Sequence, residues 1–470
     1  MAHGSSTEET GRDGLVRILG LPAMVANAVN VIVASGIFVL PAAVAAIVGR
    51  SWLVAYLICS AITALVLLSL AEAGSRVSET GGTYRYVQVA FGPFAGALLG
   101  VVLLFSSVAS NAAVAVVFAE TVGEAAPALS GGLARAVVLG VMFVALAAIN
   151  VRGVRVGARF VEVVTAAKLA PLLLLIVAGV VAMHSAGSVA GGPGAGAALP
   201  AAVSASDIGR AALVLFFAFT GIEVALTPSG EFANPARTVP RAVLIALVIV
   251  TVVYIGVHLV AQDILGADLA RDQTAPLAAT AGRLFGPRGR ALMLAAAALS
   301  TFSYVGGDIL ASPRMLFAFA RDEYLPAPMG AVHGRYRTPH LAIIIYTALA
   351  AVLALSGTFR VLAALAAIAA LLIYLACCLA VIQLRRRRVG SAGDPFLVPA
   401  GPVVPVLACL IMLWLLSHAS RGEWATIGVV LAIGVGLYLA RAGRMRRRAG
   451  RAVELEAAAE EPSRNPAPLL

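Results

Sequence analysis

Two apolar stretches of this chain are interrupted at matching places, by Val33-Ala34-Ser35-Gly36-Ile37-Phe38 and by Phe217-Ala218-Phe219-Thr220-Gly221-Ile222-Glu223. The first stretch begins near Leu15 and the second near Asp207. Backbone that leaves a helix at membrane depth is tolerated only where protein buries it or where it lines a cavity. Paired interruptions in the two halves of a chain indicate broken helices around one shared site.

The composition places the chain in a membrane. Of its 470 residues 61% are hydrophobic and 12% are charged, and the mean hydropathy is +0.96. A soluble domain carries about 25% charged residues, so lipid must cover most of this surface. Apolar runs of about 20 residues recur along the chain and predict an all-α polytopic fold with about 12 transmembrane helices. The runs lie near 15–48, 52–73, 91–125, 133–150, 159–184, 207–232, 241–261, 289–320, 338–356, 360–384, 399–418 and 423–441.

The net charge of +11 is explained by membrane orientation rather than by nucleic-acid binding. Lys168 is the only lysine, and the arginines gather in the loops that this helix assignment places on one side. By the positive-inside rule that side is cytoplasmic, which predicts a multi-pass protein of the cell membrane with both termini in the cytoplasm. The four cysteines lie inside apolar runs without metal-ligand spacing, so neither a metal nor another cofactor is expected.

The predicted organisation has four parts. Residues 1–14 form an N-terminal tail, and residues 15–384 form a ten-helix core of two repeats, about 15–184 and 207–384. A segment rich in Gly, Ala and Pro, 184–206, separates the repeats. Residues 397–441 form the last two helices, and residues 442–470 form a cytoplasmic tail.

Four groups of residues, in this order along the chain, resemble motifs of the amino acid/polyamine/organocation transporters. The first is Ser35-Gly36-Ile37-Phe38 with Pro41, and the second is Glu72 with Glu79-Thr80-Gly81-Gly82-Thr83-Tyr84-Arg85-Tyr86 and Ala90-Phe91-Gly92-Pro93. The third is 217–223 with Glu231, Asn234-Pro235, Arg237 and Pro240. The fourth is Ser312-Pro313-Arg314 with Ala320-Arg321-Asp322, Leu325-Pro326 and Thr338-Pro339.

The resemblance implies a LeuT-type fold, a five-plus-five inverted repeat in which helices 1 and 6 are discontinuous. It also implies alternating access and a substrate that carries amino and carboxyl groups. One position departs from the family pattern, because Ala34 stands where the family usually has glycine.

An amino acid substrate would need N–H donors for its carboxylate and carbonyl acceptors for its ammonium. The amides of Ser35, Gly36 and Ile37 open a half-helix, where the dipole favours an anion. The unwound carbonyls near Val33 and Ala218 can accept from the ammonium. A Ser-Gly pair is also typical of close helix packing, and the phenylalanines can be core or lipid-facing residues. The predicted substrate-binding residues are Ile32, Val33, Ala34, Ser35, Gly36, Ile37, Phe216, Phe217, Ala218, Phe219, Thr220 and Gly221.

Lys168 and Glu223 are the candidate coupling residues. A lysine in mid-span is a functional hypothesis by default, against snorkelling or a static ion pair. By the resemblance, Lys168 occupies the place where sodium-coupled relatives hold a cation, and its ammonium would bridge the first and eighth helices through carbonyls near Val31 to Ala34. By the same resemblance Phe217 aligns with a gating aromatic, and Glu223 with a carboxylate that titrates during exchange. Glu223 could instead fix the neighbouring loop by hydrogen bonds.

The sequence therefore predicts a secondary active transporter of amino acids or related amines, sodium-independent, and either proton-coupled or an exchanger. The alternatives are a channel or substrate sensor on the same fold, or an intramembrane enzyme. The run Val305-Gly306-Gly307-Asp308 lacks the first glycine of a Gly-x-Gly-Asp protease motif, which argues against an enzyme. Asp308 is expected to face the inner vestibule or to pair with Arg314, without a role in transport. Oligomeric state is left open.

Overall fold

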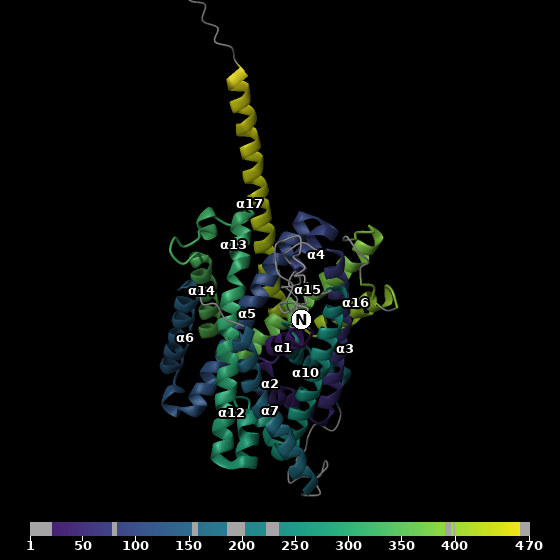
Figure 1. Cartoon of the computed structure of the whole chain (residues 1–470), viewed down its shortest axis with the longest axis vertical. Helices are drawn as coiled ribbons and strands as arrows, with labels where there is room; N and C mark the ends of the chain where they lie inside the picture. Colours follow the sequence, from purple (N-terminus) through teal and green to yellow (C-terminus); the bar gives the residue numbers. More distant parts are fainter. Residues whose placement is uncertain are drawn as a thin grey trace, which may run out of the picture.

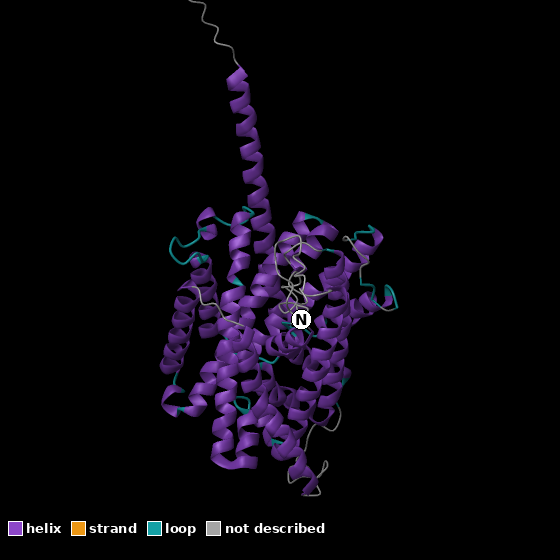
Figure 2. Ribbon diagram, viewed as in Figure 1, coloured by secondary structure: helices purple, strands orange, loops and turns teal. Residues whose placement is uncertain are grey.

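The computed structural model of the protein describes residues 21–77, 82–152, 158–185, 203–221, 235–390, 396–398 and 400–460. Within these ranges the regular structure is helical throughout, without a strand (Figures 1 and 2). The predicted tail 1–14, residues 186–202 of the seam 184–206 and residue Glu223 lie outside the described residues.

The first half of the chain begins with a helix that is split where the sequence predicts it, and the first helix of the second half ends in a 3-10 turn at its predicted break. In the first half the helices are α1 (Leu21–Ile32), α2 (Gly36–Val48), α3 (Trp52–Arg76), α4 (Gly82–Phe91), α5 (Pro93–Ala125), α6 (Gly132–Arg152) and α7 (Ala158–Ser185). The second half opens with α8 (Ala205–Phe216) and the 3-10 turn η3 (Phe217–Phe219). It continues with α10 (Pro235–Leu265), α11 (Asp268–Arg271), α12 (Pro276–Ala311), α13 (Pro313–Arg321), α14 (His340–Ser356) and α15 (Phe359–Arg386).

The last two helices are α16 (Val403–Leu416) and α17 (Arg421–Glu460). Within the described residues, eight helical segments are long and apolar enough to cross a membrane, and α14 and α16 are shorter apolar helices. With α1 and α2 separated by a break and α8 ending in a 3-10 turn, this arrangement is that of a polytopic helical membrane protein, which confirms the predicted fold class.

The centre of the bundle is formed by α5 and α15, which pack against each other. Helix α12 and helix α14 also pack on α5, while α3 and α8 pack on α15. The two interrupted helices lie together, since α2 packs against both α8 and η3. Both breaks are therefore held inside the bundle rather than at its lipid-facing surface.

Two helix ends differ from the sequence-based boundaries. Helix α12 begins at Pro276, well before the predicted run near 289–320, and Gly286 (φ 70°, ψ −160°) marks a bend within it. The twelfth helix continues to Glu460 rather than ending at 441, and it projects far beyond the bundle (Figure 1). Its 40 residues span about 60 Å at 1.5 Å per residue, twice the hydrocarbon thickness. Residues 442–460 are rich in Ala, Arg and Glu, which are strong helix formers.

Candidate functional site

The first break separates α1 from α2 at Val33–Ser35. The amide of Ala34 turns back to the carbonyl of Ile32 at 2.8 Å, and the amide of Phe38 bonds to the carbonyl of Ser35 at 3.0 Å. Regular helical hydrogen bonding is therefore interrupted here and restarts in α2. The first N–H groups of any helix have no intrahelical acceptor, so those of Gly36 and Ile37 face the break.

The second break follows α8 and consists of the 3-10 turn η3, then extended backbone at Thr220 (φ −81°, ψ 167°). Gly221 has φ +100°, a conformation that side chains disfavour, so glycine is required at this exit. The hydroxyl of Thr220 donates to the carbonyl of Phe217 at 2.8 Å and so satisfies one of the freed carbonyls.

The two breaks are in direct contact. A Cβ placed on Gly36 would lie 2.7 Å from the Cβ of Ala218, so only glycine allows the helices to approach this closely. Tyr254 on α10 connects them further, because its hydroxyl lies 3.0 Å from the carbonyl oxygens of both Ile32 and Ala218. Sequence reasoning missed Tyr254, since a lone tyrosine in an apolar run carries no motif.

The residues at the breaks are buried, and one polar atom among them has no partner. Val33, Ser35 and Phe219 are each 0% exposed. The hydroxyl of Ser35 forms no hydrogen bond with the described residues. Buried polar groups are nearly always hydrogen-bonded, so this hydroxyl and the helix-start amides beside it are available to a ligand. Such a set of donors suits a carboxylate.

The three phenylalanines of the second break are packed inside the bundle rather than facing lipid. Phe217 makes an edge contact with Phe359 on α15, with ring centroids 5.8 Å apart. Phe219 makes an edge contact with Tyr254 at 5.3 Å, and Phe216 contacts Tyr374 at 6.1 Å. Of the three, Phe217 is the most exposed, at 7%.

Lys168 lies where it can hold the first helix, though not by the predicted atoms. It is 2% exposed, and its Nζ donates to the carbonyl of Asn30 at 2.6 Å, one residue before the predicted Val31 to Ala34. The described hydrogen bonds connect the eighth helix to the break through Ser300 instead, whose hydroxyl lies 3.3 Å from the carbonyl of Val33 and 3.4 Å from that of Ala34. Two side chains therefore make the contacts that were predicted for Lys168 alone. Lys168 bonds to α1 before the break, and Ser300 of α12 bonds at the break itself.

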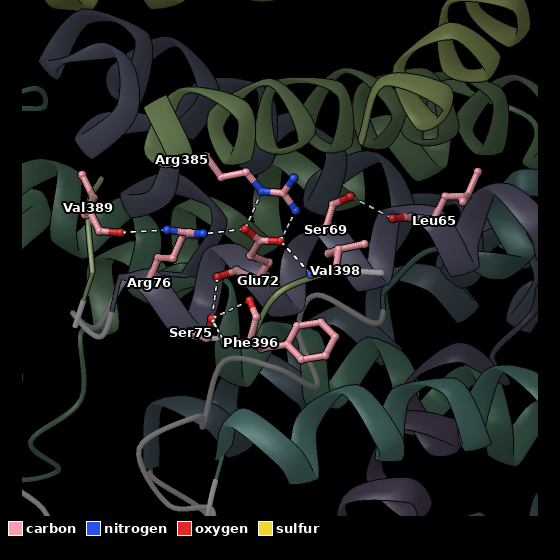
Figure 3. Close-up of polar contacts among 9 residues, drawn as sticks. All are labelled: Leu65, Ser69, Glu72, Ser75, Arg76, Arg385, Val389, Phe396 and Val398. Carbon is pink, nitrogen blue, oxygen red and sulfur yellow. Dashed lines mark hydrogen bonds and ion pairs between the residues drawn. The ribbon is translucent and has the colours of Figure 1, made fainter. Parts of the chain in front are cut away.

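A buried ion-pair cluster connects the last turns of α3 and α15 (Figure 3). Glu72 on α3 is 0% exposed and accepts from Arg76 at 2.9 Å and from Arg385 of α15 at 2.7 Å. The backbone amide of Val398 adds a bond of 2.9 Å to the same carboxylate. Arg76 in turn donates to the carbonyl of Val389 at 3.1 Å. One carboxylate therefore joins α3, α15 and the segment that leads to α16.

Comparison with known proteins places these features in a family context. Residues 19–438 match the family model described as amino acid permease. The serine/threonine exchanger SteT of Bacillus subtilis is 29% identical over 450 residues, which cover 94% of this chain and 99% of the relative. An uncharacterized transporter of Mycobacterium tuberculosis is 31% identical over 438 residues, with 91% of each chain covered. The methylthioribose transporter of Bacillus subtilis is 26% identical over 440 residues, with 90% and 93% covered.

Proposed function

Because the chain belongs to the amino acid permease family, we propose that it is a secondary active transporter of amino acids or related amines in the plasma membrane. It works by alternating access and catalyses no reaction. The protein is surrounded by membrane lipid, and both of its termini lie in the cytoplasm. The multi-pass helical architecture and the transporters among its relatives support this assignment.

The observation that carries the proposal is the unpartnered hydroxyl of Ser35 between two touching helix breaks. In the proposed complex the substrate carboxylate accepts from this hydroxyl and from the amides of Gly36 and Ile37. The ammonium is bound by carbonyls of the unwound segments, including those of Val33 and Ala218. Side-chain selectivity then falls to the residues around Phe217, the phenylalanine of the second break with the largest exposed fraction.

Substrate entry requires that the breaks separate, since they are packed directly against each other. Two contacts would have to part or slide, the close approach of Gly36 to Ala218 and the hydrogen bonds of Tyr254 to both breaks. The arrangement described above is then a closed state, from which opening toward one side of the membrane admits substrate.

Coupling is proposed to be independent of sodium. An ammonium at Lys168 bonded to the carbonyl of Asn30 places a positive charge beside the first helix and disfavours a metal cation there. Transport is then driven by protons or by exchange of one substrate for another. Glu223 remains a candidate for the titrating group.

The test is uptake by purified protein in liposomes. Labelled L-serine and L-threonine are the first probes because a relative covering almost the whole chain is named a serine/threonine exchanger. Uptake that accelerates when the lumen is preloaded with unlabelled substrate is expected of a carrier. A channel would show no such acceleration, and failure of every common amino acid and amine to enter would overturn the assignment.

A further inference from the structure

Asp308, on α12, lies in a cluster of polar side chains from three helices that is separate from the helix breaks. Its Oδ1 accepts from the hydroxyls of Ser107 on α5 at 3.0 Å and Ser312 at 2.7 Å. Its Oδ2 accepts from the amide of Asn111 at 2.7 Å and from the hydroxyl of Tyr346 on α14. Asn111 and Tyr346 are each 0% exposed, whereas Asp308 is partly buried.

The carboxylate of Asp308 has no cationic partner among the described residues. The predicted pair with Arg314 is not formed, because the side chain of Arg314 is exposed and makes no ion pair with it. Glu72 shows the contrast, since two arginines bind that buried carboxylate. An unpaired carboxylate at membrane depth is costly and marks a functional site by default.

In the part of the chain that the structure describes, α5, α2 and α6 bring no charged side chain to Asp308. Helix α5 has no ionisable side chain between Leu103 and Ala115, and α2 has none at all. On α6, Asn150 approaches the carbonyl of Gly306 at 3.5 Å, and the nearby Arg152 is exposed.

Two titratable side chains of α7 and α10 that the structure describes, Lys168 and Tyr254, are bonded elsewhere. Lys168 donates to Asn30, at the level of the break, and Tyr254 bonds to the carbonyls of the breaks. Ser300 also bonds at the break, and it lies eight residues before Asp308, about 12 Å along α12. Among the described residues, the side chains that bond to Asp308 are therefore polar but uncharged, with Tyr346 on α14 as the titratable one. Tyr304 lies one turn earlier on α12.

The cluster contains more oxygen–oxygen contacts at hydrogen-bond distance than it has hydrogens to form hydrogen bonds. Ser107 also lies 2.6 Å from the hydroxyl of Ser312 and 3.0 Å from that of Tyr346. Together with three hydroxyl contacts to Asp308, this makes five contacts at hydrogen-bond distance. Each hydroxyl donates one hydrogen, so the three hydroxyls fill at most three contacts when Asp308 is ionised. A proton added to Asp308 supplies the hydrogen for a fourth of these contacts.

We propose that Asp308 and the hydroxyls of Ser107, Ser312 and Tyr346 form an intramembrane proton-binding site. An O–H bond forms on the carboxylate when the proton binds and breaks when it leaves, without any redox step. The partial exposure of Asp308, Ser107 and Ser312 lets the proton enter and leave. Because the cluster joins α12 to α5 and α14, occupancy changes how firmly α12 is held near its junction with α13.

The proton itself is the ligand to be measured, by infrared difference spectroscopy of the full-length protein in liposomes. Spectra taken over a series of pH values should contain the C=O band of a carboxylic acid that disappears as the pH rises. The band should be missing from D308N and unchanged in D263N, a control carboxyl on α10 outside the cluster. A band that does not titrate, or one that persists in D308N, would overturn the proposal.

Two variants that keep the carboxyl cover the case in which D308N fails to fold. S312A and Y346F each remove one donor to the ionised carboxylate, so the proton should be retained to higher pH. An unchanged midpoint in both variants would also count against the site.

The link between the proton site and transport rests on the proposed function, and it is tested by separate uptake measurements. If the protein carries L-serine, its rate should depend on a pH gradient in the wild type and lose that dependence in D308N. A titrating band without uptake of any amino acid would overturn the proposed function and leave the proton site standing. Uptake with a normal pH dependence in folded D308N would remove Asp308 from coupling.

Discussion

The ammonium of Lys168 on α7 donates a 2.6 Å hydrogen bond to the carbonyl oxygen of Asn30, two residues before α1 ends. This bond joins α1, the first part of the split helix, to its neighbour α7. A change in the position of α1 must therefore stretch the bond or carry Lys168 with it, which makes this contact a point where substrate binding and helix movement can be coupled.

Removing the ammonium should impair transport more than substrate binding. Lys168 contacts α1 rather than the proposed substrate pocket, so Lys168→Ala loses the tie and leaves the binding groups at Ser35 and Gly36 in place. Coupling energies of this kind are worth about 5- to 150-fold, so exchange should fall by at least that lower factor while the binding constant changes little. Liposome exchange and a thermal-shift titration measure the two quantities.

The matched variant Lys168→Arg distinguishes two roles of the residue. Arginine keeps the charge and does not deprotonate in proteins. If Lys168→Arg supports exchange with the pH dependence of the wild type, Lys168 acts as a fixed charge. Inactivity with normal binding supports proton release by Lys168. Unchanged rate and pH dependence in Lys168→Ala would exclude both roles.

Transport should continue without sodium. The charge of Lys168 lies beside the first helix and repels a metal cation there. Replacing sodium by choline at fixed pH and osmolarity should leave the initial rate of labelled serine uptake unchanged. A rate that vanishes in choline and returns with added sodium would refute this prediction.

Enlarging Gly36 should prevent substrate binding. A Cβ at this position meets Ala218 at 2.7 Å, so Gly36→Val forces the two breaks apart and displaces the helix-start amides. Binding in a thermal-shift titration should be lost in the folded variant. Gly428→Val on α17 is the control, because a Cβ there meets nothing within 4 Å. Normal binding by a folded Gly36→Val protein would place the substrate elsewhere.

Removing the hydroxyl of Tyr254 should loosen the closed arrangement of the breaks. Tyr254→Phe keeps the edge contact with Phe219 but leaves the carbonyl of Ala218 without this donor. An unsatisfied buried group costs about 1–3 kcal/mol, so the Tm in detergent should fall. Tyr438→Phe is a suitable control, since Tyr438 packs against Phe94 through its ring. Equal Tm values for the two variants would show that the Tyr254 hydroxyl contributes little.

Neutralising Glu72 should destabilise the whole bundle. Glu72→Gln leaves Arg76 and Arg385 without their shared counter-charge, and breaking a buried pair on one side costs about 3–5 kcal/mol. A large fall in Tm is expected by differential scanning fluorimetry.

Asp268 provides the exposed counterpart to Glu72. The hydrogen bond from Arg283 holds the pKa of Asp268 below its usual range, so the small stabilisation from this pair is present at neutral pH and is lost as the pH falls through that lowered value. Exposed pairs contribute little, so Asp268→Asn should leave the Tm nearly unchanged. A Glu72→Gln variant as stable as Asp268→Asn would contradict the role assigned to the buried cluster.

The helices and the two breaks could be predicted from the sequence because their causes are local. Apolar runs long enough to cross a bilayer recur along the chain, and glycine at 221 permits a positive φ that no other residue adopts easily. The position of Lys168 in the middle of an apolar run was likewise enough to predict that it is buried. The continuation of α17 past 441 was not predicted, because the polar composition that suggested a tail is also compatible with a helix.

The partners of each buried polar group were decided only by the tertiary structure. Tyr254 joins Ile32 to Ala218 across 222 and 36 residues of sequence, and Asp308 meets Ser107 and Asn111 from a helix about 200 residues earlier. The expected partner of Asp308 was Arg314, six positions away in the sequence, yet that side chain is exposed. A run of apolar residues determines that a helix crosses the membrane, whereas the rotation and depth at which helices pack determine which side chains meet.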